Sequence, residues 1–280
     1  IGIGVARILM ACRDQLCGKI KLIFQPGEEG GRGARSMAES GIMEDVDYMF
    51  GGHVNNTPYG MVGASWDEMC NTTKVDLLFH GKASHAGAMP QRGKNALAAA
   101  ANAVLNLLAI SRHSDGYTRV NIGVCQAGSG RNVVPEDAIL KAEVRGATRE
   151  INDYMFQRAL EVARGAAEMY GCEFTYRIMG QAVDAPMDQE LIDVAVKAAD
   201  ETDGVTETDP VCHVEGGGDD ATFLMLETQK HGGKATYMLF GASVAVPFHN
   251  GRFDIDERVI LTAAKVFSNM VGRMNGASGS

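Results

Sequence analysis

KLIFQPGEEGG, residues 21–31, joins an apolar run to two adjacent carboxylates, Glu28 and Glu29, set among a proline and three glycines. The run 19–25 has the pattern of a buried strand. Like charges side by side repel, and taking them out of water is costly unless a positive group compensates them. The stretch therefore predicts a strand that ends at a charged site, with a lysine, a helix N-terminus or a metal ion as the positive partner.

The segments on either side of this stretch predict an α/β fold. Residues 3–15 repeat apolar positions at helical spacing, residues 31–40 suit a short helix closed by Gly41, and residues 46–54 (VDYMFGGHV) read as a second buried strand. Buried strands that alternate with helices indicate a parallel sheet, in which sites lie beyond the carboxyl ends of the strands. Glu28, Glu29 and His53 all occupy such positions.

The pattern changes near residue 68. It predicts strands over 72–81, 119–127, 138–146 and 172–179, and helices over 95–111 and 153–170. The order β-α-β-β-α-β is that of a ferredoxin-like α+β unit. Beyond about residue 182 the α/β pattern returns. The sequence therefore predicts a metal-binding α/β domain with a parallel or mixed sheet, formed by 1–67 and 183–280, with an inserted dimerisation or lid domain over 68–182.

Composition excludes several classes of function. The 280 residues carry a net charge of −9 and no run of Lys or Arg, which argues against a nucleic-acid groove. No apolar stretch approaches the roughly 20 residues that span a bilayer. Six cysteines without a C-x-x-C pair favour reduced thiols. We expect a cytoplasmic protein that binds neither nucleic acid nor membrane.

Four motifs carry the chemistry: FQPGEE (24–29), FGGHV (50–54), GKASHAG (81–87) and VPFHNGRFDIDE (246–257). Histidine is the commonest metal-ligating side chain, and carboxylates complete such sites. A metal accounts for the doubled glutamate, because one carboxylate can ligate while its neighbour accepts a proton from a metal-activated water.

These motifs, together with RNVVP at 131–135, resemble the dinuclear metallo-amidohydrolases of the aminoacylase and glutamate carboxypeptidase superfamily, in the branch of auxin-conjugate hydrolases and N-acyl-amino-acid deacylases. The resemblance extends over 1–275. Within the branch, SHAG, EVRGATREINDYMFQRA and HNGRFDIDE are most similar to enzymes that cleave p-aminobenzoyl-glutamate. It implies hydrolysis of the amide bond between an acyl or aroyl group and an amino acid, assisted by two divalent cations, Zn²⁺ or Mn²⁺.

The resemblance also implies residue roles. Glu28 is the expected general base, and His85 on the inserted domain is expected to stabilise the oxyanion, often across a dimer interface. The expected metal ligands are Glu29, His53 and His249. Asn132 and Arg145 are expected to bind the carboxylate end of the substrate, and Gly217, Gly218 and Asp219 to line its pocket. The sequence does not decide between a homodimer and a heterodimer with a related subunit.

One feature of the superfamily branch is missing. The branch carries an upstream C-G-H-D-x-H-x-A motif that supplies two further metal ligands, and no C-G-H-D occurs in the 280 residues. We therefore expect that the N-terminal part of the catalytic domain is absent and that this chain alone does not assemble the complete two-metal site.

Two alternatives remain open. The chain could be a general N-acyl-amino-acid deacylase or dipeptidase with the same machinery, because pocket specificity depends on few contacts. It could instead be a truncated, non-catalytic module that dimerises and binds amino-acid conjugates. The retention of Glu28, Glu29, His53 and His249 favours metal chemistry, since adjacent carboxylates are costly to keep without it.

Overall fold

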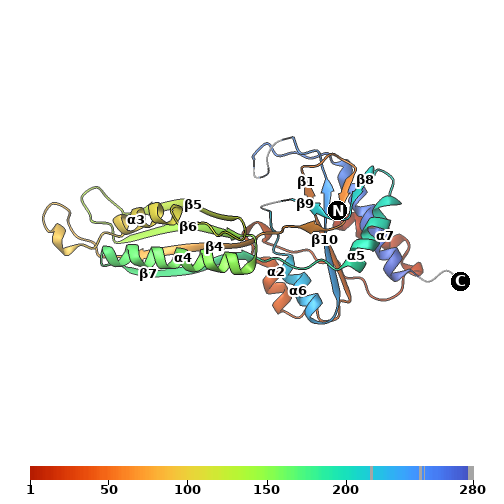
Figure 1. The fold of residues 1–280 in the computed structure, drawn as a ribbon, viewed down its shortest axis with the longest axis horizontal. Helices are drawn as coiled ribbons and strands as arrows, with labels where there is room; N and C mark the ends of the chain where they lie inside the picture. Colours follow the sequence, from red (N-terminus) through yellow and green to blue (C-terminus); the bar gives the residue numbers. More distant parts are fainter. Residues whose placement is uncertain (215–216, 246–247, 249, 277–280) are drawn as a thin grey trace.

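The computed structural model describes residues 1–214, 217–245, 248 and 250–276. The molecule is elongated, with a body at one end and an antiparallel unit, defined here as β4 to β7, at the other (Figure 1). The expected α/β body with an inserted α+β unit is confirmed. The boundaries at 68 and 182 stay a prediction.

The body is built on a four-stranded sheet in the order β1-β10-β2-β8, formed by Tyr48–Asn55, Lys234–Gly241, Met61–Gly63 and Glu207–Asp209. β1 and β10 are parallel, β10 and β2 antiparallel, and β2 and β8 parallel. A short parallel pair, β3 (Trp66–Asp67) and β9 (Cys212–His213), lies beside this sheet. The sheet is therefore mixed rather than all-parallel.

Helices cover both faces of the body sheet. Alternate residues of β10 explain this, because Met238 and Phe240 pack with α5 (Gln189–Asp200) and α7 (Arg258–Asn275), while Tyr237 and Leu239 pack with α6 (Thr222–Lys230). The helix α1 (Gly2–Ala11) packs on α7, and α2 (Gly33–Glu39) packs on α6. Two 3₁₀ turns, η1 (Arg13–Gln15) and η2 (Glu28–Gly30), lie in the N-terminal region.

The antiparallel unit has the strand order β5-β6-β4-β7, formed by Thr118–Ala127, Asp137–Gly146, Asn71–His80 and Glu173–Ala182. The helices α3 (Ala96–Leu108) and α4 (Arg149–Met169) cover one face, and a 3₁₀ turn, η3 (Pro90–Arg92), precedes α3. Buried side chains alternate with more exposed ones along β4, and Val75, Leu77 and Phe79 are buried against the helices. This is the expected ferredoxin-like arrangement.

One expected element is wrong. The segment 19–25 forms none of the strand ladders among the described residues, and three of its four apolar side chains, Ile20, Leu22 and Phe24, are 37%, 40% and 64% exposed. Lys19 and Lys21 both pair with Asp45, which holds the segment against the body through surface ion pairs. An apolar run becomes a strand only with a neighbouring strand to take its hydrogen bonds, and no described strand flanks this one.

The second expected buried strand exists but is half exposed, because β1 is an edge strand paired only with β10 among the described residues. None of the six cysteines, all of which lie in the described part of the chain, forms a disulfide, and Cys70, Cys172 and Cys212 are the buried ones. None of the described helices combines the length and apolar content that crossing a membrane requires.

Candidate active site

The doubled glutamate lies in a tight turn between two glycines. Gly27 and Gly31 adopt left-handed backbone conformations, with φ of 72° and 65°, and the 3₁₀ turn Glu28–Gly30 lies between them. Glycine enters this region without steric cost, so the letters GEEGG specify the turn. The turn leaves Glu28 half-buried and Glu29 exposed. The two carboxylates are therefore in different environments, as a division between base and ligand requires.

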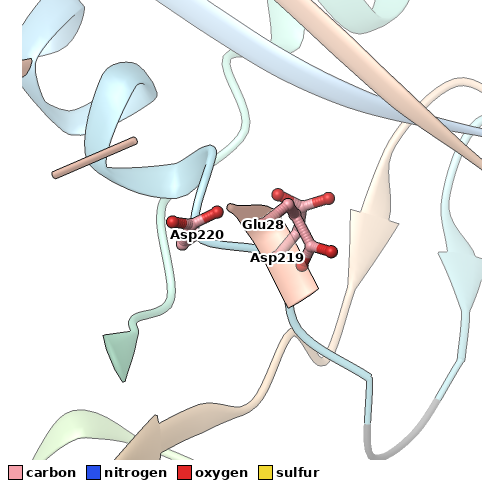
Figure 2. Close-up of side chains that lie close together, drawn as sticks. All are labelled: Glu28, Asp219 and Asp220. Atoms are coloured by element: carbon pink, nitrogen blue, oxygen red, sulfur yellow. The ribbon is translucent and has the colours of Figure 1, made fainter. Parts of the chain in front are cut away.

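Two aspartates just before α6 complete an acidic cluster around Glu28. Asp219 and Asp220 are 5% and 1% exposed, and one carboxylate oxygen from each lies within 4.8 Å of the others and of a Glu28 oxygen. Figure 2 shows the Glu28 and Asp219 side chains next to each other, with Asp220 on the neighbouring turn of chain. The cluster joins two segments that are almost 200 residues apart in the sequence.

Hydrogen bonds fix both aspartates. The Tyr237 hydroxyl on β10 and the Ala221 amide donate to the Asp219 carboxylate. The Gln25 side-chain amide, at 2.5 Å, and the Ala34 amide, at 3.1 Å, donate to the Asp220 carboxylate. Donors from the sheet, from α2 and from the segment before the glutamate turn thus hold the cluster in place.

The cluster raises the pKa of Glu28 to about 7, first because burial disfavours its charged form and then because Asp219, Glu29 and Asp220 repel it. His53 acts in the opposite direction, because a positive charge on its ring would favour the ionised form of Glu28. Burial likewise raises the pKa of Asp220, and burial followed by the charge of Asp219 raises the pKa of Tyr237 well above its usual range. A carboxyl group that titrates near neutrality suits a general base.

The structure describes two of the three expected metal ligands, Glu29 and His53. Glu29 lies on the η2 turn, where Lys74 donates to its backbone carbonyl at 2.6 Å. His53 lies at the carboxyl end of β1, exposed, with Nδ1 2.5 Å from the Val54 carbonyl oxygen and its ring edge-on to Phe248. His249 lies outside the described residues. The ligand assignment stays a prediction.

Arg145, Gly217 and Gly218 lie near the cluster. Arg145 and Gly218 line a cavity of about 50 Å³ together with Glu28 and Asp220. Gly217 packs under the linker to β4, where its carbonyl accepts from Cys70 at 2.8 Å and a Cβ would fall 2.4 Å from the Trp66 ring. Gly218 has the same constraint, since its Cβ would lie 2.8 Å from the Cys70 carbonyl.

His85 and Asn132 lie next to each other, but at the opposite end of the antiparallel unit. The Ala86 amide donates to the Asn132 carbonyl at 2.9 Å, and both loops follow strands that lead away from the body (Figure 1). The ten-residue strand β4 separates them from the junction, a length of about 30 Å. Within one chain, these residues do not reach Glu28.

Three residues near the glutamate turn were not predicted: Asp220, Tyr237 and Lys74. The adjacent acids in GGGDD repeat the pattern that singled out GEEGG, so Asp220 could have been found by the same reasoning. Tyr237 and Lys74 lie within ordinary strand patterns, and only the fold brings them to the cluster.

A larger cavity of about 390 Å³ lies on another side of the junction, between α2, α6 and the start of α4. Its charged lining residues are balanced in sign: Arg35, Arg149 and Lys230 against Glu39, Asp153 and Glu227. It contains none of the residues expected to act in catalysis, metal binding or substrate binding, so we place the candidate site at the Glu28 cluster.

The chain is similar to known proteins over most of its length. Residues 1–273 match Peptidase family M20/M25/M40. The chain belongs to this family. It is 45% identical over 269 residues to indole-3-acetyl-aspartic acid hydrolase of Enterobacter agglomerans and to one of the subunits of p-aminobenzoyl-glutamate hydrolase of Escherichia coli, covering 96% of this chain and 62% of each relative. The chain thus spans less than two-thirds of the length of these relatives.

Solved structures of other proteins show the same fold. An aminobenzoyl-glutamate utilization protein from Klebsiella pneumoniae superposes with a TM-score of 0.84 at 42% identity, over 96% of this chain and 65% of that one. A dinuclear metal-binding M20 peptidase from Bacillus subtilis superposes at 0.67 with 24% identity, over 97% and 69%. The second likeness concerns the fold alone.

The pKa of Glu28 predicts how the metal-free protein responds to pH. Because the folded pKa lies above the value near 4.5 of an unperturbed glutamate, this group favours folding most below pH 4.5 and loses that contribution as pH rises through about 7. Glu28→Gln should therefore leave stability in EDTA unchanged near pH 4. At pH 8 it should raise stability by roughly 1–2 kcal/mol, a value reduced for screening at a half-exposed site.

Thermal unfolding of both proteins at the two pH values measures this difference. Glu39→Gln, at an exposed carboxylate on α2, is the matched control and should show no such rise at pH 8. Equal melting temperatures for the Glu28→Gln variant and the parent at pH 8 would contradict the raised pKa.

Proposed function

We propose that the chain contributes to hydrolysis of the amide bond between an acyl or aroyl group and an acidic amino acid, with p-aminobenzoyl-glutamate as the preferred substrate. The main support for this proposal is the raised pKa of Glu28, about 7, which arises in a cluster of acidic side chains beside His53. The two relatives at 45% identity support the substrate class, since their names specify conjugates of aspartic acid and of glutamate.

The side chains at this site suit divalent cations. The Glu28, Asp219 and Asp220 carboxylates, with oxygens within 4.8 Å of one another, concentrate negative charge that favours a cation, and the neighbouring Glu29 and His53 offer the oxygen and nitrogen donors that Zn²⁺ and Mn²⁺ both accept. Glu29 and His53 are the described residues that would hold them, with His249 as the third expected ligand. Bound cations would lower the pKa of water and polarise the substrate carbonyl.

The chain's own residues perform the proton transfers. The Glu28 carboxylate takes a proton from the water whose oxygen forms the new bond to the carbonyl carbon, and gives it to the amine nitrogen as the C–N bond breaks. Water and amide thus become a carboxylic acid and an amine. Tyr237 keeps Asp219 in place beside Glu28, and the Arg145 guanidinium pairs with a substrate carboxylate.

We also propose assembly through α3 and β5. β5 is an edge strand of the antiparallel sheet, and the surface beside it exposes apolar side chains: Leu97 (43%), Leu105 (71%), Leu108 (50%) and Val124 (40%). Exposed apolar area on an edge favours pairing with a second copy or a related subunit. Such a partner would bring its own His85 and Asn132 toward the Glu28 cluster, which this chain's His85 and Asn132 do not reach.

A hydrolysis assay tests the proposal. The 280-residue chain is compared with a hybrid in which it replaces the matching 269 residues of the Escherichia coli relative. Both receive Mn²⁺, Zn²⁺ or EDTA with p-aminobenzoyl-L-glutamate, N-acetyl amino acids and dipeptides. We expect the hybrid, but not the 280-residue chain alone, to release p-aminobenzoate from the first substrate in a metal-dependent way. Faster turnover of the other substrates by the hybrid would instead support a general deacylase or dipeptidase.

The same assay distinguishes the non-catalytic alternative. A folded hybrid that binds metal and p-aminobenzoyl-L-glutamate but leaves every substrate intact would show that the chain is a binding module. The parental Escherichia coli protein is the positive control, and circular dichroism checks that the hybrid is folded.

A further inference from the structure

Two positively charged side chains, Lys74 and Arg145, face the small cavity beside Glu28 from neighbouring strands of the antiparallel unit. In the β4–β6 ladder Thr72 is paired with Arg145, and Lys74 with Glu143. These four side chains share one face of the sheet because side chains alternate along a strand. The intervening Thr73 bonds to Asn152 of α4, so it marks the opposite, helix-covered face. Lys74 and Arg145 are therefore directed away from the helices, and both line the cavity.

Lys74 links the antiparallel unit to the glutamate turn. Its ammonium donates to the Glu29 carbonyl at 2.6 Å, which places a positive charge beside the turn that carries Glu28. The ammonium has three N–H donors, so this bond leaves capacity for a ligand. Arg145 is held by Glu143 at 2.9 Å, with its side chain 30% exposed. Lys74 thus borders the glutamate turn, and Arg145 is anchored on β6.

A conjugate of an acidic amino acid carries two carboxylates, whereas conjugates of most other amino acids carry one. The Glu28, Asp219 and Asp220 carboxylates repel both carboxylates of such a substrate. Each substrate carboxylate therefore needs a positively charged side chain beside it to enter the site. Arg145 is already expected to bind one. The cavity of about 50 Å³ has room for a small polar group rather than for a whole conjugate.

We propose that Lys74 binds the side-chain carboxylate of the acidic amino acid and so sets the preference for aspartate and glutamate conjugates. This inference depends on the proposed function, because it assigns the substrate class of the same site. Lys74 is then a specificity-determining residue, with Arg145 taking the α-carboxylate.

A different role for Lys74 would be to position the glutamate turn through the Glu29 carbonyl. The two roles predict different results. A positioning role weakens all conjugates alike, whereas a specificity role affects only those with a side-chain carboxylate. The ratio between two ligands of equal size, one charged and one neutral, separates them.

The test compares p-aminobenzoyl-L-glutamate with p-aminobenzoyl-L-glutamine, which replaces the side-chain carboxylate by an amide. Their dissociation constants are measured by calorimetry on the 280-residue chain with Mn²⁺, in a Glu28→Gln background that prevents cleavage. We expect a preference of roughly 10- to 100-fold for the glutamate conjugate, the range for a hydrogen bond to a charged group. Lys74→Met should reduce that preference to about threefold or less and leave the glutamine conjugate little changed.

Lys74→Arg, which keeps the charge, should retain most of the preference. A Lys74→Met variant that weakens both conjugates equally, or that keeps the parental preference, overturns the inference while the proposed function stands. If neither conjugate binds to the parent chain with or without metal, the proposed function fails and this inference fails with it.

Discussion

Glu28→Gln is expected to lower kcat for p-aminobenzoyl-L-glutamate by roughly a thousandfold, within the range of about 10²–10⁴ that a general base supplies. Glutamine keeps the size and hydrogen-bonding capacity of the side chain but cannot accept and return a proton. Because Glu28 acts on water rather than on the substrate's recognition groups, KM should change little. The hybrid protein with the Escherichia coli relative provides the assay.

Glu39→Gln is the matched control for this experiment. Glu39 is an exposed carboxylate on α2 that pairs with Arg35, so its loss should leave kcat within about twofold. Full activity of the Glu28→Gln hybrid would rule out Glu28 as the base. A rise in KM with kcat unchanged would instead show that Glu28 binds substrate and does not transfer the proton.

Gly180→Ala should displace the glutamate turn and thereby reduce both stability and activity. A Cβ at Gly180 on β7 would lie 1.8 Å from the Gly30 carbonyl oxygen, far inside any permitted contact. The neighbouring Gln181 amide donates to the Gly31 carbonyl at 2.9 Å, so the turn is held against β7 and must move with it. We expect a loss of about 1–3 kcal/mol in unfolding free energy. A displacement of about 1 Å at Glu28 could lower kcat/KM on the order of 100-fold.

Gly165→Ala is the corresponding control. Gly165 lies within α4, where nothing is within 4 Å of an added Cβ, so alanine should stabilise the helix by roughly 0.5–1 kcal/mol and leave activity unchanged. Thermal unfolding and kcat/KM of the two variants measure the difference. Equal behaviour of Gly180→Ala and Gly165→Ala would be incompatible with the contact between β7 and the glutamate turn.

The antiparallel unit was predictable because its signals are local. Alternation over 72–81 and helical periodicity over 95–111 and 153–170 each identify an element without reference to the rest of the chain. Capping agrees with them, since Asn95 and Thr148 accept from the first turns of α3 and α4. The ends of the predicted helices and strands differ from the observed ends by a few residues, but the element order and sheet type are as expected.

The segment 19–25 was mispredicted because its outcome depends on a neighbour. Its apolar residues satisfy a strand pattern, yet a strand forms only beside another strand, and the lysines are instead paired with Asp45. The glutamate turn that follows it depends on local signals instead, because glycines at its two left-handed positions specify it.

The candidate site was only partly predictable for a related reason. Glu28 and Asp219 were expected from motif and resemblance, whereas Tyr237 and Lys74 come to the cluster through the pairing of β1 with β10 and of β4 with β6. His85 and Asn132 show the limit of sequence reasoning within one chain. Their motifs are intact, but β4 extends away from the body and carries them to the far end of the antiparallel unit.

The most direct measurement of the central claim is the position of bound metal. Crystals of the hybrid soaked in Mn²⁺, with diffraction recorded at the manganese absorption edge, locate the cations without reference to activity. We predict anomalous density between Glu29 and His53, next to the half-buried carboxylate at position 28. Density confined to other acidic surfaces, in crystals of a hybrid that still cleaves p-aminobenzoyl-L-glutamate, would contradict the account.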